Sequence, residues 1–122
     1  MLLIEFEACG DCYRWAFKHH LLFKAEGKNP VLKHGKVLDR WGDTSVGQGN
    51  YYDHAWLEVD GLAMDWQTMD NPARGGKYAG KGWPIADFYE YHEPQRVQSY
   101  TGSEPAELRS ITQHTGPWEI KY

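Results

Sequence analysis

The chain contains two cysteines, Cys9 and Cys12, in the segment EACGDCYRWAF (residues 7–17). Two cysteines at this spacing can form a redox pair or half of a metal site, and a single thiol can instead be a nucleophile. A helix N-terminus favours a thiolate because its unpaired N–H groups carry partial positive charge. The sequence predicts a helix over residues 11–26, capped by Asp11, which would put Cys12 in the first helical turn. Cys12 is therefore the candidate nucleophile.

A histidine and an aspartate lie in the segment DHAWLEVDGLAMDWQT (residues 53–68), where Asp60-Gly61 is a strong signal for a hairpin. A two-residue turn pairs Val59 with Leu62. The same register then places these residues opposite each other: Leu57 and Met64, Ala55 and Trp66, Trp56 and Asp65.

The two faces of this predicted hairpin differ in chemistry. One face is entirely apolar, and the other carries His54, Trp56, Glu58, Asp65 and Gln67. His54 and Asp65 are diagonal neighbours on that second face, about 7–8 Å apart between Cα atoms, a gap that two side chains can close. An imidazole held by a carboxylate is the general base that a cysteine nucleophile requires.

Three strings, GDCYRWA, HAWLEV and MDWQT, follow one another in an order that resembles the transglutaminase-like branch of the papain-like cysteine enzymes. The resemblance covers Gly10 to Thr68. It implies that Cys12 is the nucleophile, His54 the general base and acid, and Asp65 the orienting carboxylate. The same order is seen in small bacterial peptidases of this superfamily, including maturation proteases of lasso peptides.

The activity implied by this resemblance is that of a cysteine peptidase or amidase. The substrate would be a peptide or another amide-containing molecule, and the reaction would be thiol-dependent acyl transfer or hydrolysis without a cofactor. We expect Trp56 to shield the site or pack beneath it, and Gln67 to form a hydrogen bond within the triad. The backbone N–H of Cys12 is the expected oxyanion donor, and Trp41 and Tyr52 are candidates for a second one.

The elements predicted around these residues form a single α+β domain over residues 1–122. An N-terminal helix packs on a small, mainly antiparallel sheet, which is the arrangement of a papain-like or transglutaminase-like fold. A strand is expected over residues 30–38, one or two strands over 87–100, and a helix over 104–114 capped by Ser103. Loops cover residues 39–52 and the glycine-rich stretch 71–84.

Composition limits the partners and the compartment. Hydrophobic residues make up 41% and aromatic residues 15% of the chain, which is typical of a folded domain. The formal net charge of -4 gives no basic field for nucleic acid or an anionic membrane. The apolar start is too short for a signal peptide or a membrane span, so we expect a cytoplasmic protein whose thiols stay reduced.

Three other interpretations remain open. In a thiol-disulfide oxidoreductase, Cys9 would attack and Cys12 would resolve, but the expected alternation of strands and helices is missing. A zinc site could add His19, His20 or His34, but no second pair at ligand spacing follows, so no metal site is predicted. The third is a non-catalytic binding or accessory domain on the same scaffold.

Overall fold

The computed structural model describes the backbone of residues 2–42, 44–70 and 76–118, with the side chains from Cys12 onward in these ranges. The helices are α1 (Leu2–Ala25), α2 (Trp66–Asp70), α4 (Ile85–His92) and α5 (Glu104–Thr112), with a short 3-10 helix, η1 (Gly76–Tyr78). The strands are β1 (Val31–Leu38), β2 (Tyr51–Val59), β3 (Leu62–Met64), β4 (Trp83–Pro84) and β5 (Gln95–Tyr100).

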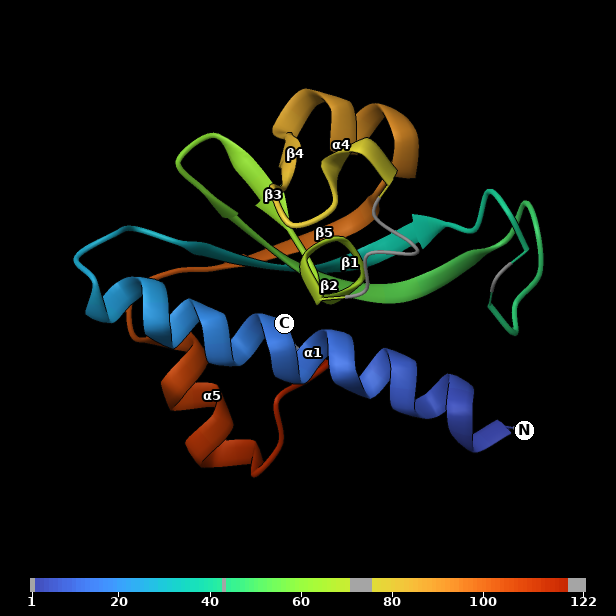
Figure 1. The fold of residues 1–122 in the computed structure, drawn as a ribbon. Coiled ribbons are helices and arrows are strands. Elements are labelled where there is room, and N and C mark those ends of the chain that lie inside the picture. The colour runs from blue at the N-terminus through green and yellow to red at the C-terminus, as the bar shows by residue number, and fades with distance from the viewer. Residues whose placement is uncertain (1, 43, 71–75, 119–122) are drawn as a thin grey trace.

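The strands form one sheet in the order β4-β3-β2-β1-β5, and every neighbouring pair is antiparallel. Helix α1 lies along one side of the sheet and α4 lies on the other (Figure 1). The predicted α+β class, with an N-terminal helix on an antiparallel sheet, is confirmed at this level.

Helix α1 begins earlier than the sequence analysis predicts. It starts at Leu2 instead of near Asp11, so Cys12 lies about three turns into the helix and not in its first turn. The prediction was wrong because LLIEFEA, just before Cys9, consists of residues that a helix accommodates without a break. The C-terminal end agrees with the prediction, since Gly27 adopts a φ of 87° just beyond it.

The hairpin forms at the predicted turn, but β3 is short. Val59 pairs with Leu62 and Leu57 pairs with Met64, as expected, and Asp60 and Gly61 have φ values of 55° and 81°. Pairing ends at Met64, so the expected pairs of Trp66 and Asp65 with β2 do not form. The chain turns into α2 instead.

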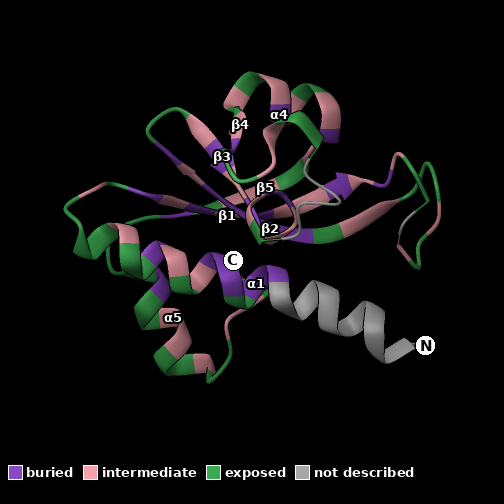
Figure 2. Cartoon of the chain, viewed as in Figure 1, coloured by how far each residue is buried: buried purple, intermediate pink, exposed green. Residues whose placement is uncertain are grey.

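Both faces of the sheet are covered by apolar side chains. On the α1 side, the buried cluster consists of Tyr13, Trp15, Ala16, Leu32, Ala55, Leu57, Tyr100 and Trp118. On the α4 side, it consists of Val37, Trp56, Ala63 and Phe88. The hairpin face that the sequence analysis assigned to polar chemistry is therefore a second core, and β2 is buried along most of its length (Figure 2).

Helix α4 replaces the first part of the strand expected over residues 87–100. Ile85, Phe88 and His92 recur at intervals of three and four, the period of one helix face, and Pro84 precedes the first turn. This pattern was the signal that the sequence analysis missed. Strand β5 and helix α5 do form, although Ser103 donates to Glu107 and not to the helix backbone.

Candidate active site

His54 and Asp65 form a buried pair. Nε2 of His54 donates to Oδ2 of Asp65 over 2.8 Å, and the side chains are 0% and 1% exposed. The proximity that the hairpin register predicted is therefore present, although Asp65 stands after β3 and not opposite Trp56. Because Nε2 is used by Asp65, only Nδ1 of the imidazole is available for proton transfer.

Asp65 is fixed in orientation by the start of α2. Its Oδ1 accepts the backbone N–H of Thr68 over 2.7 Å, the bond of a helix-capping aspartate. Trp83 in turn donates its indole N–H to Oγ1 of Thr68 over 2.8 Å. Burial by itself raises the pKa of Asp65, but hydrogen bonds from His54 and Thr68 outweigh it and lower that pKa, which keeps the carboxylate ionised.

Cys12 is the second side chain that acts on this imidazole. Nδ1 of His54 is buried and has no hydrogen bond of regular geometry to a described residue. Burial disfavours the charged ring, but the interactions with Cys12 and Asp65 outweigh this effect and raise the pKa of His54 to about 10. The three predicted triad residues are thus brought together.

The short β3 explains how α1 and β2 meet at this point. Strand β3 pairs only with Leu57–Val59, so the first half of β2 has β1 on one side and no strand of the described chain on the other. Helix α2 follows at that edge, and α1 contacts both β2 and α2. Cys12, His54 and Asp65 converge where the sheet leaves this gap.

Three aromatic rings surround His54. Tyr52 meets it edge-on at 5.7 Å between ring centroids, and Trp56 stacks at 6.1 Å. His92 of α4 lies parallel to it at 6.5 Å with 9° between the ring planes. Burial and the neighbouring His54 lower the pKa of His92 to about 4, so this second imidazole is neutral. The sequence analysis did not identify His92.

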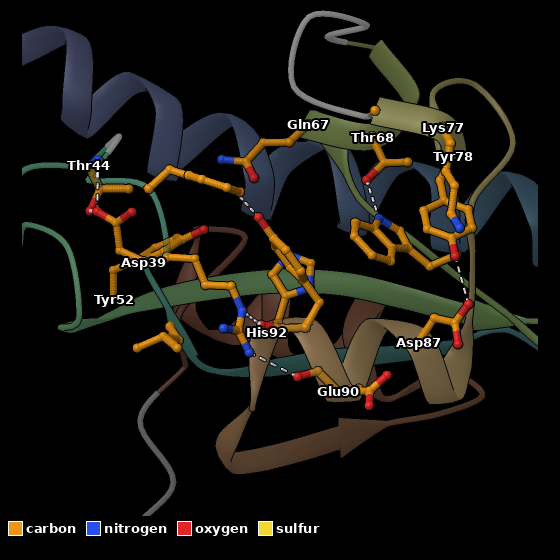
Figure 3. A pocket seen from close by; sticks show the side chains of 16 residues that line it. Asp39, Thr44, Tyr52, Gln67, Thr68, Lys77, Tyr78, Asp87, Glu90 and His92 are labelled. Atoms are coloured by element: carbon orange, nitrogen blue, oxygen red, sulfur yellow. Dashed lines mark hydrogen bonds between the residues drawn. The ribbon is translucent and has the colours of Figure 1, made fainter.

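A cavity of about 850 Å³ adjoins this cluster. Tyr52 and His92 form part of its wall, as do Gln67 and Thr68 of α2 (Figure 3). Cys12 is 2% exposed and is not among the lining residues. Tyr52, His92 and Thr68 line the cavity and each also contacts His54 or Asp65, so the cavity borders the Cys12–His54–Asp65 cluster.

The supporting residues differ in how far they match the expectations. Trp56 packs beside His54 and donates its indole N–H to Glu58. Gln67 lines the cavity but makes no hydrogen bond to the described triad side chains, because Thr68 supplies the bond to Asp65. Trp41 is 71% exposed and its N–H is donated to the Tyr91 hydroxyl, so it is not placed as an oxyanion donor. Tyr52 does lie beside His54.

Two other expectations concern Cys9 and metal ligands. The side chain of Cys9 lies outside the described residues, as do those of Asp11 and of residues 71–75 in the glycine-rich stretch. Cys9 and Cys12 both lie within α1, so the strand that a thioredoxin-like arrangement requires before them is absent. Among the described side chains, no cluster of three or more His, Cys, Asp or Glu residues could hold a metal ion.

Comparisons with protein-family models, curated proteins and solved structures found no match to this chain. None of the described helices combines the length and apolar character needed to cross a bilayer.

Proposed function

We propose that this protein is a transglutaminase-like cysteine enzyme of papain-like fold that acts on amide bonds. The observation that carries the proposal is the buried His54–Asp65 pair, 2.8 Å apart, with Cys12 interacting with the same imidazole. The order of the three residues along the chain and the antiparallel sheet that follows α1 also support it. A reducing compartment such as the cytoplasm would keep the Cys12 thiol available.

In the first half of the reaction, the Cys12 thiolate forms a bond to the substrate carbonyl carbon, and the π electrons move to the carbonyl oxygen. When that tetrahedral intermediate collapses, the C–N bond breaks and the leaving amine takes the proton from Nδ1 of His54. Asp65 holds Nε2 throughout and stabilises the positive charge of the ring. The product of this half is a thioester on Cys12.

In the second half, water or a second amine attacks the thioester. Neutral His54 takes the proton of the attacking group at Nδ1, and collapse of the second intermediate breaks the C–S bond and restores the thiolate. The raised pKa of His54, about 10, suits the imidazolium form that is present before the first attack. Hydrolysis and amine transfer share these steps and differ only in the attacking group.

The proposed mechanism does not use the Cys12 backbone N–H or the helix N-terminus, which the sequence analysis had assigned to it. Because Cys12 lies inside α1, its backbone N–H belongs to the helix ladder and does not serve as an oxyanion donor. The helix N-terminus also does not favour its thiolate, so the imidazolium of His54 takes that role. Tyr52, edge-on to His54, is the remaining predicted candidate for a donor near the carbonyl oxygen.

The burial of Cys12 favours one competing function, a non-catalytic binding domain that keeps the same scaffold. The two are separated by the rate at which iodoacetamide modifies Cys12 in the native chain, with the labelled cysteine identified by mass spectrometry. For an enzyme, we expect Cys12 to react at neutral pH, and His54→Ala to slow that reaction at least tenfold because it removes the charge opposite the sulfur.

The matched control is His114→Ala, which removes an exposed histidine just beyond the C-terminal end of α5. It should leave the Cys12 rate unchanged, and circular dichroism should show that both variants are folded. If Cys12 of the native chain reacts only when urea unfolds it, or at the same rate with and without His54, the binding-domain function replaces the enzymatic one.

A further inference from the structure

The cavity beside the triad is lined by groups that favour a cation. Its aromatic residues are Trp41, Tyr52, Tyr78, Trp83 and Tyr91. Two of these rings already hold a cation of the chain: the Arg40 guanidinium lies 5.0 Å from the Tyr91 ring centroid, and the Lys77 ammonium lies 5.2 Å from that of Tyr78. The face of an aromatic ring attracts positive charge, most strongly where water is partly excluded.

The charges of the lining residues also favour a cation. Arg40 is compensated, because it donates to Glu93 outside the lining and to the backbone carbonyls of Glu90 and Tyr91. Among the described lining residues, this leaves one ammonium, Lys77, against the carboxylates of Asp87 and Glu90. The carboxylate of Asp39 also lines the cavity but already accepts from Gly42 and Thr44. The described lining residues therefore carry an excess of negative charge.

Asp87 and Glu90 both have carboxylate oxygens that can accept further hydrogen bonds. The Tyr78 hydroxyl donates to Oδ2 of Asp87 over 2.7 Å, and Oδ1 has no hydrogen bond to a described residue. The carboxylate of Glu90 is exposed and forms no ion pair with a described residue. Figure 3 shows both residues on the α4 side of the cavity, together with His92.

His92 adds a neutral acceptor. Its Nδ1 lies 3.1 Å from the carbonyl oxygen of Phe88, which can only accept, so Nδ1 carries the proton. Nε2 of the neutral ring is then a lone-pair acceptor, and no described residue donates to it. The aromatic rings of the cavity offer surfaces for stacking, and the carboxylates and this nitrogen offer hydrogen-bond acceptors. A flat cation with several N–H groups would complement both.

We propose that this cavity binds the side chain of an arginine residue in the substrate, next to the amide that Cys12 attacks. The guanidinium stacks on the aromatic wall and donates to Asp87, Glu90 and Nε2 of His92. Arginine fits better than lysine because its planar fork can stack and donate in several directions at once. The proposal rests on the proposed function for the adjoining Cys12, and the arginine side chain is bound intact and takes no part in the reaction.

The test is an NMR titration at low ionic strength with Nα-acetyl-arginine methylamide. Two matched ligands accompany it: the citrulline analogue, which has the same shape without the charge, and the glutamate analogue, which has the opposite charge. The titrations use the native chain and Cys12→Ala, in which no acyl transfer consumes the ligand. We expect the arginine ligand to bind at least about tenfold more tightly than either other ligand.

Two substitutions locate the binding. Asp87→Asn keeps the side-chain shape and an acceptor for Tyr78, and His92→Phe keeps a ring without Nε2; each should weaken arginine binding about three- to tenfold. Asp60→Asn removes an exposed carboxylate at the hairpin turn and should change nothing.

Equal binding of arginine and citrulline would overturn the proposal, as would tighter binding of the glutamate ligand through Lys77. Arginine binding that survives both Asp87→Asn and His92→Phe would also overturn it. These outcomes are independent of Cys12 labelling. Cation binding can fail while the thiol reacts through His54, or persist in a chain whose thiol is inert, so the two proposals fail separately.

Discussion

At the scale of single residues, Asp65 has two functions at once. Its Oδ2 accepts from His54 and its Oδ1 accepts from the first turn of α2, so one carboxylate both orients the imidazole and ends the hairpin. An asparagine would retain an acceptor for Thr68 but would lose the negative charge. A substitution by asparagine therefore separates the effect of the Asp65 charge on His54 from the effect of its hydrogen bond to Thr68.

We predict that Asp65→Asn leaves the fold intact and lowers the pKa of His54 by about 1 to 3, because an ionised neighbour of the imidazolium is removed. Nitrogen-15 NMR titration of the His54 ring measures this change. The control is Asp70→Asn in the same helix, whose carboxylate accepts from Trp15 and not from His54. An unchanged His54 titration in Asp65→Asn would contradict the assigned pair.

At the scale of elements, the segment after α5 (residues 113–118) packs against the α1 side of the sheet. Trp118 belongs to the buried cluster on that side, and Gly116 packs against His34 and Tyr13. A Cβ built on Gly116 would lie 2.5 Å from Cε1 of His34 and 2.9 Å from Cδ1 of Tyr13. Only glycine allows this close approach.

We predict that Gly116→Ala destabilises the protein by about 2 to 4 kcal/mol, because a backbone strain of about 1 kcal/mol at φ 119° adds to steric overlap in the core. Gly27→Ala is the matched control. Gly27 also has a positive φ, 87°, but nothing lies within 4 Å of an added Cβ, so only the strain remains. Urea unfolding of both variants measures the difference, and equal losses would show that the contact with His34 has no energetic role.

At the scale of the whole molecule, histidines are buried without charge on both sides of the sheet. His34 lies among Tyr13, Tyr100 and Trp118, and neither of its ring nitrogens has a hydrogen bond to a described residue. Burial lowers its pKa to about 3. His92, on the α4 side, has a pKa of about 4. Protonating either ring in the folded state places an unpaired charge in the interior.

We predict that the free energy of unfolding falls as pH decreases below about 6.5. The unfolded chain takes up protons at the ordinary histidine pKa of 6.5, whereas folded His34 and His92 do so only near 3 and 4. Between these values the unfolded state binds more protons, so each group costs about 1.4 kcal/mol per pH unit.

Urea unfolding at several pH values measures this slope. His34→Leu should flatten it by up to about 1.4 kcal/mol per pH unit, whereas Gly27→Ala, which changes no titratable group, should leave the slope unchanged. A slope that is identical in the parent and His34→Leu would show that His34 is not held neutral. His54 has the opposite sign, because its raised pKa adds stability that is lost only as pH rises toward 10.

Local patterns in the sequence determined the hairpin turn, the strand pairing beside it and the positions of two helix ends. Asp60-Gly61 fixed the turn and hence the pairing of Leu57 with Met64, because turn chemistry and the period of two are properties of neighbouring residues. The same register brought His54 within reach of Asp65. The end of α1 just before Gly27 and the position of α5 were also predictable, since both depend on local breakers and caps.

Only the tertiary structure decided how these parts meet. The packing of α1 on one face of the sheet and of α4 over Trp56 on the other depends on contacts between residues far apart in the chain. No local pattern revealed that His92 would stack on His54, or that a cavity would form between α2 and α4. Burial is a property of the assembled layers, so the sequence supplied the reactive groups and the packing decided their surroundings.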